Sequence, residues 1–440
     1  MEFKILLKKI LGIKEKYLLE NIYTPTKAAS QNYIRRPKIE KQIIRSVKIP
    51  GNQIILYGHS GGGKTTIIRK VLETLNRNYI VTSCVTDSTI DEIIVNAFDK
   101  INPFYTSERS CKTTFKITNS LKASYHKIEA SLSSEFSEEV SQKQVRALPL
   151  QLTFERLGEF LGAAECIWVI EDFHKVKENE KQRLSDIMKS FVDISNDYEK
   201  VKIIAIGAVA TAREVINYNQ DIVTRISEIP IPLLSKDELS QIIENGAKLL
   251  NVEFEGKLID GTVYYSNSLG SLCHQLCYSH CEEQGIDQTA KSKIIINYNV
   301  LETSIKNYVD QKSDTFQQKL DKALKQRKTK FENVKLILNS FIDLGKEEVT
   351  YSELLNKIQE WEPEYPQSNL TVYLKPLTTN AHDEMIRFDS NSGKYSFSDP
   401  FFKAYCAMVF EQGHSDRVHF DVDIKLFISQ IQEWIWEKVK

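Results

Sequence analysis

The chain has 440 residues and a formal net charge of −1, and 41% of its residues are hydrophobic. This composition provides enough apolar surface for folded cores, so it excludes a chain that is disordered throughout. No apolar run approaches the roughly 18 residues of a membrane span, so we expect no membrane contact. The seven cysteines are scattered along the sequence, which predicts a reduced cytoplasmic protein without a disulfide framework.

Charge is distributed unevenly. The first 48 residues hold 12 Lys/Arg but only four Asp/Glu. Such a basic segment binds nucleic acid or lipid in some proteins and is a solvated lysine-rich face in others, so both readings stay open. Within it, residues 1–29 are predicted to form a basic helix and a lead-in to the first domain.

Short apolar runs alternate with helical patterns between residues 30 and 232, which predicts an α/β domain built on a parallel sheet. Nine serines between residues 107 and 141 indicate an insertion at about residues 107–147. Strands are expected at residues 54–57, 79–84, 167–170 and 201–206, and helices at residues 65–75, 152–161 and 182–192.

Helical patterns dominate after the prolines at positions 230 and 232. Ser235 and Glu238 are spaced as a capping box, which begins a predicted all-α lid over residues 233–310. A basic helical linker is expected at residues 311–331. Three helices followed by a hairpin over residues 332–410 have the order of a winged-helix domain, and residues 411–440 read as an amphipathic helix.

The segment between the first predicted strand and the following helix is rich in glycine. It matches the phosphate-loop pattern G-x-x-x-x-G-K-[ST] in full. The glycines allow successive N–H groups to point at phosphate oxygens. Lys64 is expected to reach the β- and γ-phosphates, and Thr65 to supply a hydroxyl to Mg²⁺. The predicted nucleotide-binding residues are Gly58, His59, Ser60, Gly61, Gly62, Gly63, Lys64, Thr65 and Thr66.

A second acidic element ends the apolar run that begins at Cys166. Glu171 is expected to hold Mg²⁺ together with Thr65, and Asp172 to orient or deprotonate the attacking water. Cysteine and histidine residues recur between Cys273 and Cys281, but ligands from one helix give poor tetrahedral geometry. We therefore expect buried free cysteines there, with zinc as the alternative.

These motifs together resemble the AAA+ and STAND branch of P-loop ATPases, particularly the ORC/Cdc6-like group. The resemblance covers about residues 20–410, on YIRRPKIE, GHSGGGKTT, IWVIEDFHKV, VKIIAIGAVATAREV and TRISEIPIPLLSKDEL. It implies an α/β P-loop NTPase core with an all-α lid and a C-terminal winged-helix domain. No arginine lies close to Gly270–His274, where AAA+ lids place one, so AAA+ and STAND both remain open.

The resemblance also implies roles for further residues. Tyr33, Ile34 and Arg35 correspond to the segment that closes over adenine. Thr211 corresponds to a polar sensor after the strand at residues 201–206. Arg225 corresponds to an arginine finger that acts across a subunit interface, which implies a homo-oligomer.

The implied function is an ATP-binding and ATP-hydrolysing switch that oligomerises through its nucleotide, with ATP and Mg²⁺ as cofactors. No nuclease or protease motif appears, so the resemblance implies a bacterial regulatory or anti-phage defence ATPase that acts with a separate protein effector. The alternative is an initiator-like or transposition target-selection ATPase that clamps duplex DNA. The expected recognition helix at residues 368–377 carries one lysine, which leaves DNA binding by this domain undecided.

Overall fold

The computed structural model describes residues 16–101, 153–208, 220–325, 330–379, 382–390 and 392–412. These residues form two compact units. One unit is Ala28–Leu234, and the other consists of the described residues of Met1–Lys27 and Ser235–Lys440. The predicted serine-rich insertion and the expected helix beyond residue 412 lie outside these ranges. Within them, no helix has the length and apolar character needed to cross a membrane.

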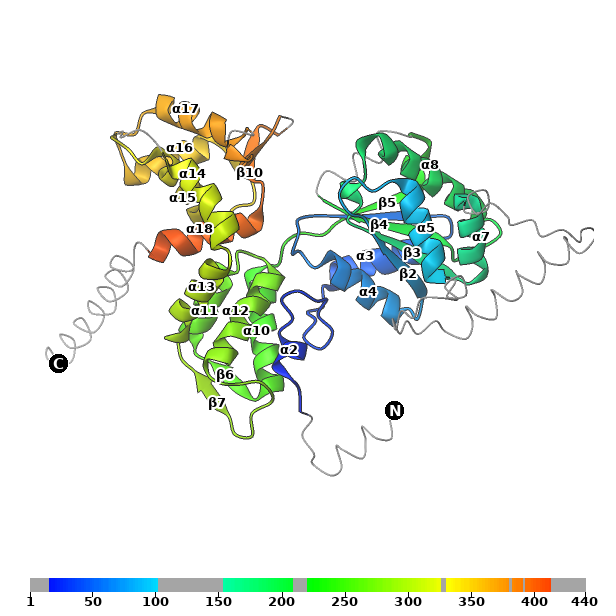
Figure 1. The fold of residues 1–440 in the computed structure, drawn as a ribbon, viewed down its shortest axis with the longest axis horizontal. Helices are drawn as coiled ribbons and strands as arrows, with labels where there is room; N and C mark the ends of the chain where they lie inside the picture. Colours follow the sequence, from blue (N-terminus) through cyan, green and yellow to red (C-terminus); the bar gives the residue numbers. More distant parts are fainter. Residues whose placement is uncertain are drawn as a thin grey trace, which may run out of the picture. The chain divides into compact units, whose positions relative to one another are not determined.

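A five-stranded sheet forms the centre of the Ala28–Leu234 unit, with strand order β2-β3-β4-β1-β5 (Figure 1). All neighbouring strands are parallel. The crossover from β1 runs to β2 on one side of the sheet, and the crossover from β4 passes β1 to reach β5 on the other side. Ligands commonly bind at the carboxyl ends of the strands at such a switch point. The strands are β1 (Gln53–Tyr57), β2 (Asn78–Ser83), β3 (Cys166–Glu171), β4 (Lys202–Gly207) and β5 (Ile226–Pro230).

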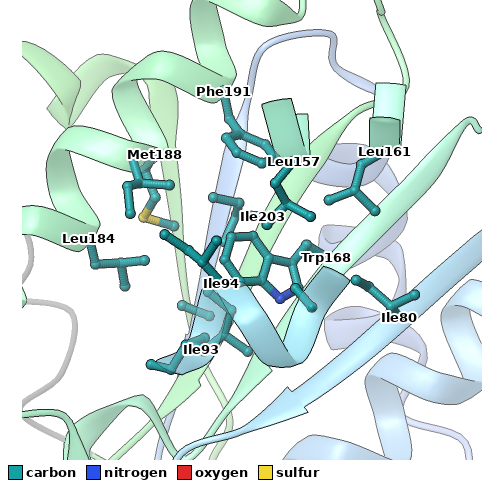
Figure 2. Packing of buried hydrophobic residues seen from close by; sticks show 14 of the residues in the cluster. Ile80, Ile93, Ile94, Leu157, Leu161, Trp168, Leu184, Met188, Phe191 and Ile203 are labelled. Atoms are coloured by element: carbon teal, nitrogen blue, oxygen red, sulfur yellow. The ribbon is translucent and has the colours of Figure 1, made fainter. Parts of the chain in front are cut away.

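Helices cover both faces of this sheet, as the sequence alternation predicts (Figure 1). Side chains of β3 alternate between two buried apolar clusters, as neighbouring residues of a strand must. Figure 2 shows Trp168 inside the larger cluster, where its Nε1 donates a hydrogen bond to Thr82 Oγ1 at 2.9 Å. One face carries α3 (Pro37–Lys48) and α4 (Lys64–Thr74), and the other α5 (Ile90–Ile101), α7 (Phe154–Ala163) and α8 (Glu178–Ile194).

Strand β5 is an element that the sequence pattern did not predict. Pro230 occupies its last position and pairs in register with Tyr57. Proline is tolerated there because β5 is the edge strand, so its missing N–H interrupts no further ladder.

The second unit begins with helices, as expected, but it is not all-α. Ser235 caps α10 (Lys236–Leu250) in a complete capping box with Glu238, which confirms that prediction. Correcting the all-α expectation, β6 (Val252–Phe254) and β7 (Ile294–Ile296) form a parallel pair. Three-residue strands are too short to produce a readable alternation in the sequence. The other helices here are α11 (Gly256–Tyr265), α12 (Gly270–Glu283) and α13 (Val300–Gln311).

The segment before the P-loop unit belongs to this second unit. It contains the short helix α2 (Leu19–Ile22). The ring of Tyr23 is fully buried, and its hydroxyl donates to Ile243 O at 2.8 Å. A Cβ at position 246 would lie 2.4 Å from that ring, so only glycine fits beneath it. Residues 17–24 are therefore anchored on α10 and α12, apart from the domain whose lead-in they were expected to form.

The remaining described residues of the second unit form five α-helices, the short helix η5 and a three-stranded antiparallel sheet of order β8-β10-β9. Thr350 and Glu353 form a second capping box. The expected linker region packs against this part, since the Phe316 ring lies 5.6 Å from the Phe402 ring and Lys319 Nζ donates to Asp383 O at 3.1 Å. The elements are η5 (Ser313–Gln317), α14 (Gln318–Leu324), α15 (Asn333–Asp343), β8 (Val349–Thr350), α16 (Tyr351–Trp361), α17 (Gln367–Leu377), β9 (Ile386–Asp389), β10 (Lys394–Phe397) and α18 (Pro400–Gln412).

Candidate nucleotide-binding site

A tight loop connects the carboxyl end of β1 to the first residue of α4. Gly61 and Gly63 have φ angles of 77° and 82°, a conformation that glycine adopts at low cost. The Gly62 N–H donates to His59 O at 3.3 Å and closes a turn within the loop. Lys64 begins the helix, so the positive end of the helix dipole directly follows the loop. This is the backbone arrangement that binds phosphate groups.

The other predicted members of the loop lie where the pattern requires. Ser60 is exposed, and His59 is half-buried. Thr65 and Thr66 occupy the first turn of α4 and are also half-buried. The Thr65 hydroxyl therefore lies in the first turn of α4, directly after the loop. A hydroxyl at this position can coordinate a cation that is bound to the phosphates.

The loop is packed against the chain that follows β5. A Cβ on Gly58 would lie 2.3 Å from Ile231 O, so no larger residue fits without moving the backbone. The Ile231 N–H donates to Tyr57 O at 2.8 Å, and the buried Arg36 guanidinium donates to Pro232 O at 2.9 Å. Residues 231–233 thus form one wall beside the loop, which the sequence did not assign to the site.

The Lys64 side chain lies over its own loop. Its Nζ donates to Gly58 O at 2.8 Å and to His59 O at 2.7 Å. Burial lowers the pKa of Lys64 to about 8, and the negative charge of Asp172 partly opposes this shift. The loop lysine and the second acid of β3 therefore interact electrostatically, although the two are 108 positions apart in sequence.

Glu171, the first acid, is the last residue of β3. Its Oε1 lies 3.6 Å from Nη2 of Arg69 on α4, and its Oε2 lies 3.5 Å from the Ser83 hydroxyl at the end of β2. The side chain is largely buried, with 17% of its surface exposed. Arg69 was not among the predicted site residues, because an arginine in the second turn of a helix carries no motif.

Asp172 follows with a left-handed backbone (φ 57°, ψ 33°), which turns the chain sharply out of the strand. Its carboxylate forms an ion pair with Lys175 at 2.7 Å, and both side chains are about half exposed. The two acids therefore differ in surroundings: Glu171 faces α4 and β2, whereas Asp172 is about half exposed and pairs with Lys175.

The proposed adenine segment is fixed by Glu40 of α3. This carboxylate accepts hydrogen bonds from the Tyr33 hydroxyl at 2.8 Å and from Nη2 of Arg35 at 3.1 Å. The Arg36 N–H also donates to it at 2.9 Å. Burial raises the pKa of Glu40, but these donors more than compensate and hold it below its usual value. Ile34 is buried, while the Arg35 side chain is largely exposed.

The last two predicted residues are Thr211 and Arg225. Thr211 lies outside the described residues. Arg225 is exposed at the end of η4 (Gln220–Arg225), immediately before the edge strand β5. Among the residues that the structure describes, Arg225 forms no hydrogen bond or ion pair with the loop of residues 58–65.

The oxygen ligands available beside the loop suit Mg²⁺, which prefers carboxylate, hydroxyl and water oxygens. Thr65, Glu171 and Asp172 provide such groups, and the Oε1 atom of Glu171 is buried without a hydrogen-bond donor among the described residues. A Mg²⁺ ion held there would neutralise phosphate charge. The donor set thus fits the metal that the phosphate loop implies.

The cysteine and histidine residues of α12 are buried and engaged in packing. The His274 Nδ1 accepts a hydrogen bond from the Thr24 N–H at 3.1 Å. The His280 ring lies 3.0 Å from Thr262 Oγ1 and 2.8 Å from Ser304 Oγ. Across the part of the chain that the structure describes, no group of three His, Cys, Asp or Glu side chains is placed to hold a metal.

Comparison with known proteins agrees with this core. Residues 50–215 match the family model of the AAA domain. No curated protein matches the chain. The Walker-type ATPase paby2304 of Pyrococcus abyssi is similar in structure, with a TM-score of 0.51 and 13% identity over 87% of this chain and 98% of that chain.

Two further structures are similar at lower scores. The ORC2 protein of Aeropyrum pernix has a TM-score of 0.43 and 11% identity over 90% of this chain and 98% of that chain. Cdc6p of Pyrobaculum aerophilum has a TM-score of 0.39 and 13% identity over 89% and 98% of the two chains. Residues 50–215 are thus similar to the AAA domain, and the parallel sheet with its flanking helices matches a P-loop NTPase core.

Proposed function

We propose that the chain binds ATP with Mg²⁺ at the loop of residues 58–65 and hydrolyses it as a molecular switch. The observation that carries this proposal is the meeting of three features at one edge of the sheet. The glycine loop precedes a helix N-terminus, Lys64 lies over the loop, and Asp172 directly follows the carboxyl end of β3. Phosphate binding, charge neutralisation and activation of water need these three groups together.

The roles follow from the chemistry of each residue. Backbone N–H groups of residues 61–65 bind phosphate oxygens, and Lys64 exchanges its two carbonyl partners for the β- and γ-phosphates. Thr65 and Glu171 hold the metal. Asp172, the more exposed acid, orients and accepts a proton from the attacking water. Tyr33, Ile34 and Arg35, fixed through Glu40, contact the adenine.

Arg225 is proposed to act on a neighbouring subunit. Its exposure at the end of η4 supports this role, because a cation that serves another chain must lie on the surface. Neutralising charge on a neighbour's γ-phosphate would make hydrolysis dependent on assembly. Thr211 is proposed as the sensor of the γ-phosphate after β4. The chain would then be a nucleotide-driven homo-oligomer.

The region of residues 332–410 is proposed to be a winged-helix domain that binds a protein effector. Its element order, helix–strand–helix–helix–hairpin, supports this assignment. The region contains 12 Asp/Glu and seven Lys/Arg, and binding to the phosphates of DNA requires a positive surface. The acidic balance therefore favours a protein partner, as in a regulatory or defence ATPase, over the clamping of duplex DNA.

ATP binding and hydrolysis by the full chain test the proposal. Lys64→Ala should weaken ATP binding about 10- to 100-fold, since a charge-assisted hydrogen bond is lost. Asp172→Ala should abolish hydrolysis while ATP still binds. Wild-type rates in both variants would refute the assignment, whereas binding without hydrolysis in the wild type would reduce the protein to a nucleotide-dependent scaffold.

A further inference from the structure

Arg69 and Glu171 form an ion pair beneath the phosphate loop. Arg69 belongs to α4, the helix that the loop begins, and Glu171 ends β3. The distance between Nη2 of Arg69 and Oε1 of Glu171 is 3.6 Å. The first acid of the site is therefore already paired with a fixed cation of the same chain.

The pair is loose. A separation of 3.6 Å is within ion-pair range but too long for a hydrogen bond. Arg69 Nε and Glu171 Oε1 are both buried, and neither has a hydrogen-bond partner among the residues the structure describes. A buried carboxylate oxygen without a donor is costly, so the group gains free energy from any stronger cationic ligand that reaches it.

The position of Arg69 on the helix connects the pair to the metal site. Thr65 and Arg69 are separated by four residues, so they lie on the same face of α4, one turn apart. Glu171 can thus either pair with Arg69 or bind a metal ion held by Thr65.

We propose that Arg69 competes with Mg²⁺ for Glu171 and thereby sets how strongly nucleotide binding depends on the metal. This inference rests on the proposed ATP site. Glu171 can satisfy one strong cation at a time, because its second oxygen already faces the Ser83 hydroxyl. Arg69 is therefore a positioning residue that acts through the metal ligand.

The test measures metal dependence separately from catalysis. Binding of a fluorescent, non-hydrolysable ATP analogue to the full chain is titrated in EDTA and with increasing Mg²⁺. Arg69→Met removes the charge and retains the length of the side chain. It should lower the Mg²⁺ concentration at half-effect, where binding of the analogue is half-maximal, about three- to fivefold. This change corresponds to the free energy of a half-exposed ion pair. Binding in EDTA should stay unchanged.

Two matched variants complete the design. Lys70→Met removes an exposed ion pair with Glu73 from the same helix and should leave the metal dependence as in the wild type. Arg69→Lys keeps a positive charge and should also stay close to the wild type. Thermal unfolding confirms that each variant is folded, and the electron paramagnetic resonance of Mn²⁺ reports metal binding directly.

The outcomes separate this inference from the proposed function. The competition would be overturned if the Mg²⁺ concentration at half-effect in Arg69→Met equals or exceeds that of the wild type. A supporting role for Arg69 predicts the higher value. Failure of the wild type to bind the analogue in either condition would instead overturn the ATP site itself. The proposal is supported if the Mg²⁺ concentration at half-effect falls in Arg69→Met and stays at the wild-type value in Lys70→Met and Arg69→Lys.

Discussion

Lys64 donates a 2.8 Å hydrogen bond to the carbonyl oxygen of Gly58, the residue that begins its own loop. The ammonium group therefore has its hydrogen bonds partly satisfied by the loop backbone. Anionic phosphates are stronger acceptors than carbonyl groups. Exchange of the carbonyl partners for phosphate oxygens is thus the change that we expect when a nucleotide binds.

The first prediction concerns pH. Burial lowers the pKa of Lys64 to about 8, against the opposing effect of Asp172. Bound phosphate favours the charged lysine, so binding requires proton uptake once the pH exceeds this value. The affinity for ATP should be constant below pH 8 and fall by up to about tenfold per pH unit above it. Lys64→Arg, which stays charged, is the control, and a parallel decline in this variant would reject the explanation.

A second prediction uses the close approach of the loop to residue 231. Gly58→Ala places a Cβ 2.3 Å from Ile231 O. Forcing these backbones apart should cost about 1–3 kcal/mol of stability and abolish nucleotide binding. Gly256→Ala is the matched control, because nothing lies within 4 Å of its added Cβ at the start of α11. Chemical denaturation measures both changes, and equal effects would contradict the prediction.

The third prediction separates adenine from phosphate. Glu40→Ala leaves the Tyr33 hydroxyl and the buried Arg36 N–H without their acceptor, at a cost of about 1–3 kcal/mol. The variant should lose affinity for ATP but retain affinity for inorganic triphosphate, since the phosphate loop is untouched. Competition binding with both ligands measures the ratio. An equal loss of affinity for the two ligands would show that this segment does not contact the adenine.

Much of this site could be predicted because its signals are local. The strand–loop–helix frame around residues 58–65 and the Ser235 capping box require only neighbouring residues, and the structure has them as predicted. The acids at the end of β3 were visible because an apolar run stops at them. By contrast, the pairing of Arg69 with Glu171 spans 102 positions, and only the packing of α4 on the sheet creates it.

Other elements escaped prediction for physical reasons. Strand β5 was not predicted because proline normally disfavours a strand. Its edge position tolerates the proline, since the missing N–H interrupts no further ladder. The docking of Tyr23 over Gly246 depends on a close contact between distant segments, and neither residue has a distinctive local pattern. The basic residues near 319–330 were read as a linker, yet Lys319 and Lys322 contact Asp383 in the next structural part. Tertiary contacts of this kind leave no periodic signal in the sequence.

The fourth prediction tests catalysis across subunits. Arg225→Ala and Lys64→Ala should each be inactive as pure proteins. Mixing the two allows the intact nucleotide site of the first variant to meet the intact arginine of the second. Hydrolysis should then reappear in the mixture, as followed by phosphate release. Continued inactivity of the mixture, with oligomers present by light scattering, would place Arg225 outside the catalytic interface.

The fifth prediction concerns the acidic region of residues 332–410, with 12 Asp/Glu and seven Lys/Arg. If it binds protein, duplex DNA should change neither the ATPase rate nor the oligomeric state at low or physiological salt. Polyglutamate of matched charge serves as a polyanion control. DNA stimulation that declines steeply with salt would support the DNA-clamping alternative instead.

The central claim is that residues 58–65 bind the phosphates of ATP. A crystal structure of the full chain with Mg²⁺ and a non-hydrolysable ATP analogue tests it most directly. We predict phosphate oxygens within hydrogen-bonding distance of the N–H groups of residues 61–65, Lys64 turned from its carbonyl partners to the phosphates, and adenine beside Tyr33. A nucleotide bound elsewhere, or Lys64 still bonded to Gly58 O with the analogue present, would contradict the account.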